Sequence, residues 1–208
     1  MTQGLLLIGA SGLAREVLVA GITGVVGILD DDVNLHDTEV GGVPVLGALA
    51  LAAKRDEQLL VCVGPSVSRR NVVRRLAKFG VADNRYATYV ARSAHVGATS
   101  DIGAGSILLD SVIVTADARV GRHVVVMPNC TITHDDVLDD FSTLAAGVAL
   151  GGGVHVGEAA YLGMNASVRQ GLSVGTEATV GMGAAVITNV PPQQKWAGVP
   201  ARELGETE

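Results

Sequence analysis

The residue whose setting best suits chemistry is His134. It lies in the segment 132–136, which reads Ile-Thr-His-Asp-Asp, just past an aliphatic residue and among polar neighbours. Gly152 follows 18 residues later, in the middle of three consecutive glycines. Acyl transfer needs a base for the nucleophile and a hydrogen-bond donor for the oxyanion. An imidazole that faces the backbone N–H of a glycine would provide both groups.

No comparable setting is found at the other four histidines, His36, His95, His123 and His155. The first lies in a polar loop. His95 and His155 directly precede aliphatic residues that should point inward, so both imidazoles should point outward. No pair of histidines has the spacing and flanking partners that are typical of a metal site, so no metal is predicted.

A repeat of six residues surrounds His134 and Gly152. Every sixth residue from 90 to 186 is Val, Ile or Leu, and the side chain two residues earlier is usually small. Positions two apart on a strand share one face, so each repeat turns one aliphatic and one small side chain inward. Such a repeat predicts a parallel β-helix. The aliphatic positions are Val90, Val96, Ile102, Leu108, Val114, Val120, Val126, Ile132, Leu138, Leu144, Leu150, Val156, Leu162, Val168, Val174, Val180 and Val186.

Two inward positions of this repeat hold side chains that could react. Cys130 occupies a small position among apolar residues, so we interpret it as part of the core and not as a nucleophile. Asp136 occupies another. Burying a carboxylate is costly unless it is hydrogen-bonded, so we expect Asp136 to have a partner or a water.

The first 87 residues show a different pattern. Apolar runs at 5–8, 25–29 and 59–63 are typical of buried strands, and segments 13–20, 48–57 and 66–79 are typical of helices. The last of these helices carries its basic residues on one polar side. Alternating strands and helices predict a small, Rossmann-like parallel sheet covered on both faces. We therefore expect two domains, an α/β domain at 1–87 and a β-helix with a C-terminal cap at 88–208.

A glycine-containing turn follows the first strand. Gly9, Ser11 and Gly12 lie in the segment 9–12, where backbone N–H groups and a helix N-terminus could approach a phosphate. The segment lacks the full dinucleotide fingerprint, so a plain tight turn is an equally open interpretation.

Other candidate ligand contacts lie at the ends of the next strands. Asp30 and Asp31 are placed where such folds hydrogen-bond a ribose or base, although a solvated acidic turn is the alternative. Gly64 would line the same crevice, and Arg69 is close enough in sequence to reach a phosphate, or is simply helix surface.

Composition limits the classes of partner. The net charge is −6 and no run of Lys or Arg is present, which disfavours nucleic-acid binding. No apolar stretch reaches the ~20 residues of a membrane span. The two cysteines are far apart and in apolar surroundings, as in reduced proteins, so a cytoplasmic location is expected.

Together these motifs resemble a known family, the sialic-acid O-acetyltransferases and UDP-4-amino-sugar N-acetyltransferases of bacterial glycan pathways. The similarity covers the segment 9–12, the pair Asp30-Asp31, the pair His134-Asp135 and the segment 198–202. The resemblance implies a left-handed β-helix with three repeats in each coil and a homotrimer with active sites between subunits. Gly152 would then lie one coil, or ~4.8 Å, from His134.

The resemblance also implies residue roles. His134 would be the general base, Asp135 would orient or polarise it, Gly152 would contact the thioester carbonyl, and the front domain would hold the nucleotide of a nucleotide-linked sugar. Acetyl-CoA would lie between subunits along the later coils. Its expected contacts are Gly152, Met164, Ala166, Gly183 and Ala184 in the wall of the groove, with Arg169 and Lys195 at the phosphates.

The predicted function is therefore acetyl-CoA-dependent N-acetylation of a nucleotide-linked amino sugar by direct transfer. O-acetylation of sialic acid, or of a related hydroxyl or amino acid substrate, would use the same scaffold, and nucleotide binding by the front domain would decide between them. A metal-dependent β-helix enzyme would need several converging histidines. A non-catalytic assembly module would not require His134 and Gly152 to be in register.

Overall fold

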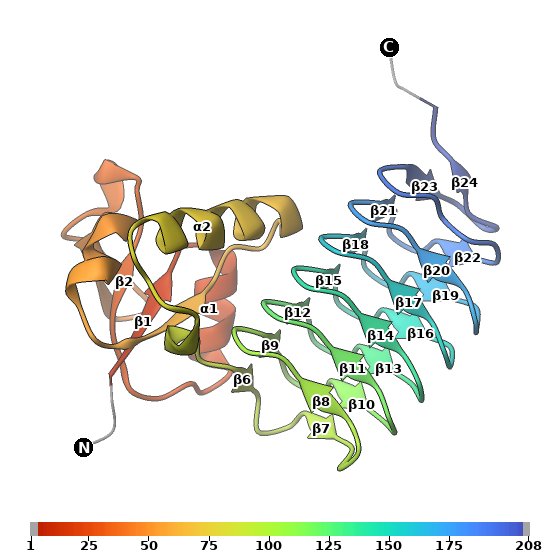
Figure 1. The fold of residues 1–208 in the computed structure, drawn as a ribbon, viewed down its shortest axis with the longest axis horizontal. Coiled ribbons are helices and arrows are strands. Elements are labelled where there is room, and N and C mark those ends of the chain that lie inside the picture. The colour runs from red at the N-terminus through yellow and green to blue at the C-terminus, as the bar shows by residue number, and fades with distance from the viewer. Residues whose placement is uncertain (1–3, 206–208) are drawn as a thin grey trace.

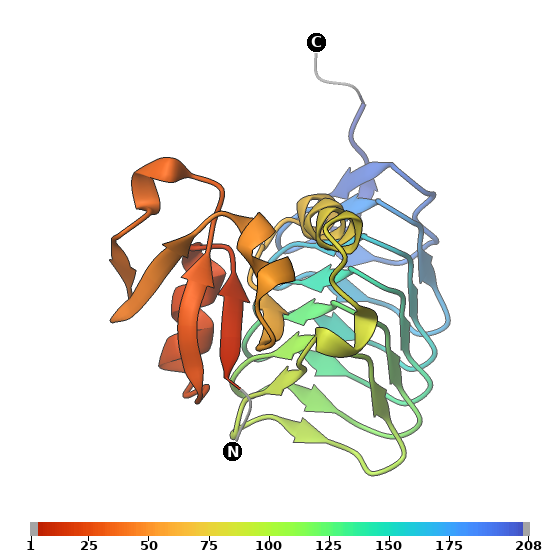
Figure 2. The ribbon, with the colours of Figure 1, turned by 60° about the vertical axis from the view of Figure 1, so that its left-hand side comes forward.

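The computed structural model describes residues 4–205, which form two regions that lie side by side (Figures 1 and 2). An α/β region is followed by a stack of coils that extends to the C-terminus. Most strands of the chain are short, repeated and parallel, in agreement with the predicted β-helix. None of the helices within residues 4–205 is long and apolar enough to cross a membrane.

The α/β region contains a five-stranded sheet in the order β3-β4-β2-β1-β5. All pairs are parallel except β3 and β4, which form an antiparallel pair that the sequence patterns did not predict. The segment 48–57, predicted as a helix, contains only a short 3-10 helix. The elements are β1 (Leu5–Ile8), α1 (Gly12–Val19), β2 (Val25–Leu29), η1 (Val33–Leu35), β3 (Glu39–Val40), β4 (Val43–Gly47), η2 (Leu49–Lys54), β5 (Gln58–Val61), α2 (Ser66–Lys78) and η3 (Asp83–Arg85).

The turn between β1 and α1 is fixed by local chemistry. Gly9 has a φ of 103°, a backbone conformation that favours glycine, and a side chain there would meet the Cys62 carbonyl. Ser11 caps α1, since its Oγ accepts the Leu13 N–H at 3.1 Å and donates to the Cys62 carbonyl at 2.6 Å. The turn is thereby held against the end of the third predicted strand.

The β-helix consists of two-residue strands that form three parallel sheets along the sides of a prism (Figure 1). Each of the aliphatic positions predicted from the sequence is the second residue of one of these strands. The strands are β6 (Tyr89–Val90), β7 (His95–Val96), β8 (Asp101–Ile102), β9 (Ile107–Leu108), β10 (Ile113–Val114), β11 (Arg119–Val120), β12 (Val125–Val126), β13 (Thr131–Ile132), β14 (Val137–Leu138), β15 (Thr143–Leu144), β16 (Ala149–Leu150), β17 (His155–Val156), β18 (Tyr161–Leu162), β19 (Ser167–Val168), β20 (Ser173–Val174), β21 (Thr179–Val180) and β22 (Ala185–Val186).

Strand register confirms the 18-residue coil. Ile113 in β10 pairs with Thr131 in β13, and Thr131 pairs with Ala149 in β16. The aliphatic positions are buried from Leu108 onward, whereas Val90 at the open first coil is 38% exposed. At the other end of the stack, the strands β23 (Lys195–Ala197) and β24 (Arg202–Glu203) extend one of the sheets. Trp196 of β23 packs against the core, as expected for a cap.

The corners of the prism repeat as strictly as its sides. From Gly105 to Gly183, every sixth residue has a positive φ between 53° and 80°. Asn, Asp and Gly take most of these positions because they adopt the left-handed conformation at the lowest cost. Asp135 is one of these residues, with a φ of 61°. Its side chain therefore leaves the backbone at a corner, where the prism meets solvent.

The α/β region covers one side of the prism. The outward residues Ile107, Leu109 and Val125 belong to the same hydrophobic cluster as β1 and α1. Helix α2 lies along one edge, where Arg70 forms ion pairs with Glu158, at 3.0 Å, and with Glu177. The predicted polar side of this helix is therefore partly an interface, and not all of it faces solvent.

Candidate active site

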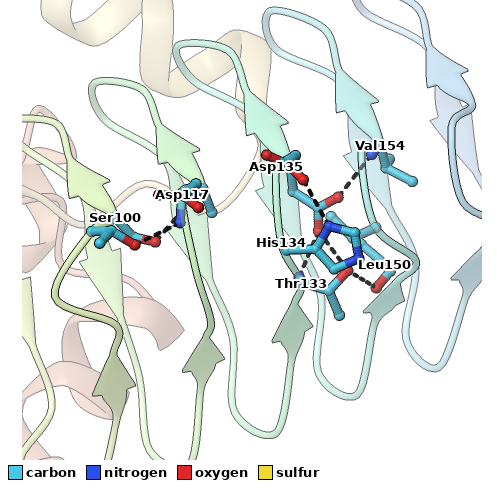
Figure 3. A network of polar contacts seen from close by, with 10 residues as sticks. Ser100, Asp117, Thr133, His134, Asp135, Leu150 and Val154 are labelled. Atoms are coloured by element: carbon cyan, nitrogen blue, oxygen red, sulfur yellow. Dashed lines mark hydrogen bonds and ion pairs between the residues drawn. The ribbon is translucent and has the colours of Figure 1, made fainter.

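His134 and Asp135 form a pair at one edge of the prism, between β13 and β14 (Figure 3). The Nδ1 atom of His134 lies 2.7 Å from Oδ2 of Asp135. This hydrogen bond raises the pKa of His134, because the carboxylate favours the protonated imidazole. A Nδ1–H that donates to Asp135 leaves Nε2 with its lone pair, and the side chain is 68% exposed. His134 can thus accept a proton at Nε2 from a bound molecule.

Gly152 lies directly beneath this imidazole, one coil further along. A Cβ atom built on Gly152 would lie 2.4 Å from both Cε1 and Nε2 of His134, so only glycine leaves room for the ring. The Gly153 N–H donates to the His134 carbonyl at 2.9 Å, which holds the two coils together at this point. Within residues 4–205, the Gly152 N–H has no hydrogen-bond partner. The imidazole of His134 and a backbone N–H without a partner are therefore adjacent, which is the arrangement expected from the sequence.

Asp136 points into the prism and is 0% exposed. Its carboxylate accepts the Thr133 N–H at 2.6 Å and the Val154 N–H at 2.8 Å, so the expected partners are present. Burial raises the pKa of Asp136 to about 6, against the opposing effect of these hydrogen bonds.

Cys130 also points inward, as predicted, and its Sγ lies 3.1 Å from the Ala145 carbonyl. Burial raises the pKa of this thiol to about 11, so it is not a thiolate at neutral pH.

A cleft of about 820 Å³ lies between the α/β region and the prism. Gly12, Gly64 and Pro65 line it from the α/β side. The prism contributes the outward residues of β12, β15, β18 and β21, which are Val125, Thr143, Tyr161 and Thr179. These four residues were not predicted as cleft residues, although they occur at intervals of 18, each directly before an inward aliphatic residue.

His134 does not line this cleft. The cleft lies over the sheet that contains β12 and β15, whereas His134 lies at the edge between the two other sheets. The prism separates the two within one chain.

The predicted phosphate-binding turn lies partly at the cleft. Gly12 lines it, while Gly9 is buried and Ser11 is engaged with Cys62. Asp30 accepts the Ala10 N–H at 2.7 Å, so this carboxylate stabilises the turn itself. Asp31 accepts the Leu49 N–H at 3.2 Å and forms an ion pair with Arg75 at 2.8 Å. Both carboxylates therefore have partners within the chain.

Arg69 is not available to a ligand, and the prediction that it reaches a phosphate is corrected. The side chain is 0% exposed, and its guanidinium group donates to five backbone carbonyl groups of both regions and to the Thr143 hydroxyl. Burial lowers the pKa of Arg69 to about 9, so it stays protonated at neutral pH. The carbonyls belong to Val63, Gly64, His123, Phe141 and Ser142.

Apart from Gly152, which lies beside His134 as described above, the residues predicted to contact acetyl-CoA divide into two groups. Ala166 and Ala184 are buried in the core because they occupy inward positions of the repeat, so they cannot form the wall of a surface groove. Met164, Arg169, Gly183 and Lys195 are exposed, and Met164 also lines the cleft described above. These four remain candidates for contact with the donor.

The other histidines have structural surroundings. His95 and His155 are exposed as predicted, and Nε2 of His155 lies 2.9 Å from Asp139. His123 is buried against Tyr86 and Phe141, and burial lowers the pKa of its imidazole to about 4. Within the described part of the chain, no group of three His, Cys, Asp or Glu side chains could hold a metal ion.

Several solved structures share this architecture. PerB from Caulobacter crescentus, in complex with CoA and GDP-perosamine, is 30% identical in sequence, with a TM-score of 0.88 over 99% of each chain. The chain belongs to the left-handed β-helix acyltransferases. The family resemblance found in the sequence, and with it the left-handed winding of the prism, is thereby confirmed.

Two other left-handed β-helix acyltransferases match over nearly their whole length. The acetyltransferase domain of PglB from Neisseria gonorrhoeae FA1090, in complex with acetyl coenzyme A, is 29% identical, with a TM-score of 0.88 over 98% of this chain and 100% of that one. WeeI from Acinetobacter baumannii AYE is 27% identical, with a TM-score of 0.76 over 97% and 99% of the two chains. No model of a protein family matches the sequence.

Proposed function

We propose that the protein transfers the acetyl group of acetyl-CoA to the amino group of a nucleotide-linked amino sugar. The observation that carries the proposal is the imidazole of His134 above the free N–H of Gly152. Support comes from PerB, a perosamine N-acetyltransferase that is similar over the whole chain and whose structure contains CoA and GDP-perosamine.

In the proposed reaction the sugar amine attacks the acetyl carbonyl carbon. Nε2 of His134 removes a proton from the amine as the C–N bond forms, and Asp135 stabilises the resulting imidazolium through Nδ1. The Gly152 N–H donates to the oxyanion of the tetrahedral intermediate. The C–S bond then breaks, and coenzyme A leaves as the thiol after it receives the proton.

We assign the two regions separate roles in this reaction. Residues 1–87 form a Rossmann-like domain that binds the nucleotide, and its cleft-lining residues Gly12 and Gly64 lie where strands of the parallel sheet end. Residues 88–208 form the acetyltransferase domain. Ser11 and Asp30 shape the turn between β1 and α1 through the hydrogen bonds described above, and Gly9 does so through its positive φ. Asp31 holds the start of η2 through the Leu49 N–H.

A homotrimer would complete the site. The cleft and His134 lie on different sides of one prism, so a second copy of the chain must bring its edge to the cleft of the first. Acetyl-CoA would lie between the two copies, near Met164 and Gly183, with Arg169 and Lys195 available to its phosphates. The cytoplasmic location expected from the sequence stays a prediction.

The test uses the full chain with acetyl-CoA and UDP-, dTDP- or GDP-linked amino sugars, and release of the thiol is measured. We expect release with at least one amino sugar and none with the matching hydroxyl sugar. The His134→Ala variant should lose at least ~100-fold in kcat and still bind acetyl-CoA. Release only with hydroxyl acceptors, or near-normal turnover by the variant, would contradict the proposal.

A further inference from the structure

The hydrogen-bond ladder of the prism is interrupted at one place, directly before His134. From Ala91 to Arg169, the residue after each inward aliphatic donates its N–H to the carbonyl of the aliphatic one coil later. Within this described stretch, Thr133 is the exception. Its N–H does not bond to Leu150, and β13 pairs with β16 through the single residue pair Thr131 and Ala149. The preceding pair of strands, β10 and β13, has two such residue pairs.

Asp136 causes the interruption. One carboxylate oxygen, Oδ2, accepts the Thr133 N–H at 2.6 Å, and the other accepts the Val154 N–H at 2.8 Å. The Leu150 carbonyl accepts a hydrogen bond from the Thr133 hydroxyl at 3.1 Å, in place of the bond from the Thr133 N–H (Figure 3). A side chain has thus replaced a backbone group in the ladder.

Ser100 shows what an ordinary residue does at the same position. It lies 36 residues before Asp136, in the same column of the prism, and its Oγ accepts the Ala118 N–H at 3.0 Å. Its hydroxyl donates to the Thr115 carbonyl at 2.9 Å, which an ionised carboxylate cannot do. The Gly97 N–H therefore keeps its regular bond to Val114 at 2.9 Å. Figure 3 shows Ser100 and Thr133 along the same edge of the prism.

The interruption lies between the two coils that form the proposed active site. Thr133 precedes His134, and Leu150 lies two residues before Gly152. We propose that Asp136 is a positioning residue whose carboxylate opens the ladder at Thr133 and thereby sets the orientation of the His134 imidazole over Gly152. This inference rests on the proposed function of His134.

Burial of the carboxylate supports this role. A fully buried acid with a pKa of about 6 is ionised at pH 8 at a cost to stability, because its ordinary pKa is near 3.8. A serine would fit the column without that cost, as Ser100 does. The chain thus carries a destabilising group at the one place where it alters the ladder beside His134.

The first experiment replaces the carboxylate. Asp136→Ser should restore the regular ladder, lower kcat by about tenfold or more and change the KM for acetyl-CoA little. Asp136→Asn retains an acceptor for Val154 but lacks the second acceptor for Thr133, so it should lose a similar factor. The midpoint of thermal unfolding of Asp136→Ser at pH 8 should rise by a few degrees, and the difference should shrink as the pH falls below 6.

A matched control introduces the carboxylate into the same column far from His134. Ser100→Asp should lower the midpoint of unfolding and leave kcat unchanged. If Asp136→Ser and Asp136→Asn keep kcat within twofold of the unmodified chain, or if they fail to fold, the proposal is wrong.

A readout without turnover separates this proposal from the proposed function. In the NMR titration of His134, Asp136→Ser should lower the apparent pKa of the imidazole, since both the charge and the orientation change. An unchanged titration together with an unchanged kcat would overturn the role of Asp136. If no amino sugar is acetylated by the unmodified chain, the proposed function fails while the titration still tests the geometry.

Discussion

The contacts that stabilise the prism differ in kind from the contacts that join the prism to the α/β region. In the prism, the same ladder recurs from coil to coil except at Thr133, left-handed corners recur from Gly105 to Gly183, and each coil contacts mainly its neighbours. Between the prism and the α/β region, single side chains make contacts that occur once. The single side chain of Arg69, for example, donates to carbonyl groups of both regions. The repeated contacts position His134, the proposed base, and the single contacts hold the α/β region beside the prism, so the two should respond differently to substitution.

The largest effect is expected in the prism at Gly152. A Gly152→Ala methyl group would overlap the imidazole and push it out of position, while the exposed ring can move without disturbing the core. We expect kcat to fall about 100-fold with almost no change in the thermal midpoint. Gln170 occupies the same position one coil later, so Gln170→Ala is the control and should remain active. A Gly152→Ala variant with full activity would show that the ring does not act at this place.

The next effect concerns stability at the interface between α2 and the prism around Arg69, which we call the joint. Arg69→Met removes the donors of several buried carbonyl groups, which should lower the free energy of unfolding by about 2–4 kcal/mol. Denaturant unfolding measures this loss. Arg74 is on the same helix but exposed, and Arg74→Met should change stability by less than about 0.5 kcal/mol. Equal losses of stability in the two variants would show that the buried contacts of Arg69 contribute no more than an exposed arginine does.

The smallest effect is a shift in pH dependence. The base must be neutral, so kcat/KM should fall as the pH drops through the raised pKa of His134. Asp135→Asn removes the carboxylate that raises this pKa, and the acid limb of the profile should move to lower pH. Stopped-time assays from pH 5 to 9 would detect the shift. An acid limb that stays in place would mean that Asp135 does not act on His134.

Sequence alone was sufficient for the prism because its rule is local and repeated. Each inward aliphatic residue could be assigned from its position, and the coil length placed Gly152 beside His134. The same rule should have excluded Ala166 and Ala184 from the donor groove, since both occupy inward positions. The prediction was wrong because it relied on the small size of these side chains and did not take account of the direction in which they point.

The joint could not be predicted, for a physical reason. Arg69 lies on a basic amphipathic helix, where an arginine is ordinarily exposed, and only the docking of that helix on the prism reveals its partners. The interruption at Thr133 was equally hidden. A partner for Asp136 could be expected from the cost of burying a charge. Which N–H groups it takes depends on the local backbone between Thr133 and Asp136 and on the position of Val154 in the next coil.

The regular stacking of the coils also determines how the length of such a chain can change. An insertion of 18 residues after Gly171 would add one whole turn of the prism, and the cap around Trp196 would move outward by one strand spacing, ~4.8 Å. Insertions that are not multiples of 18 residues would shift every later side chain to a different position around the prism. The polypeptide can therefore grow at this end only in units of one coil; His134, Gly152 and the contacts of Arg69 would stay in place, whereas Arg70 would lose its ion pair with Glu177.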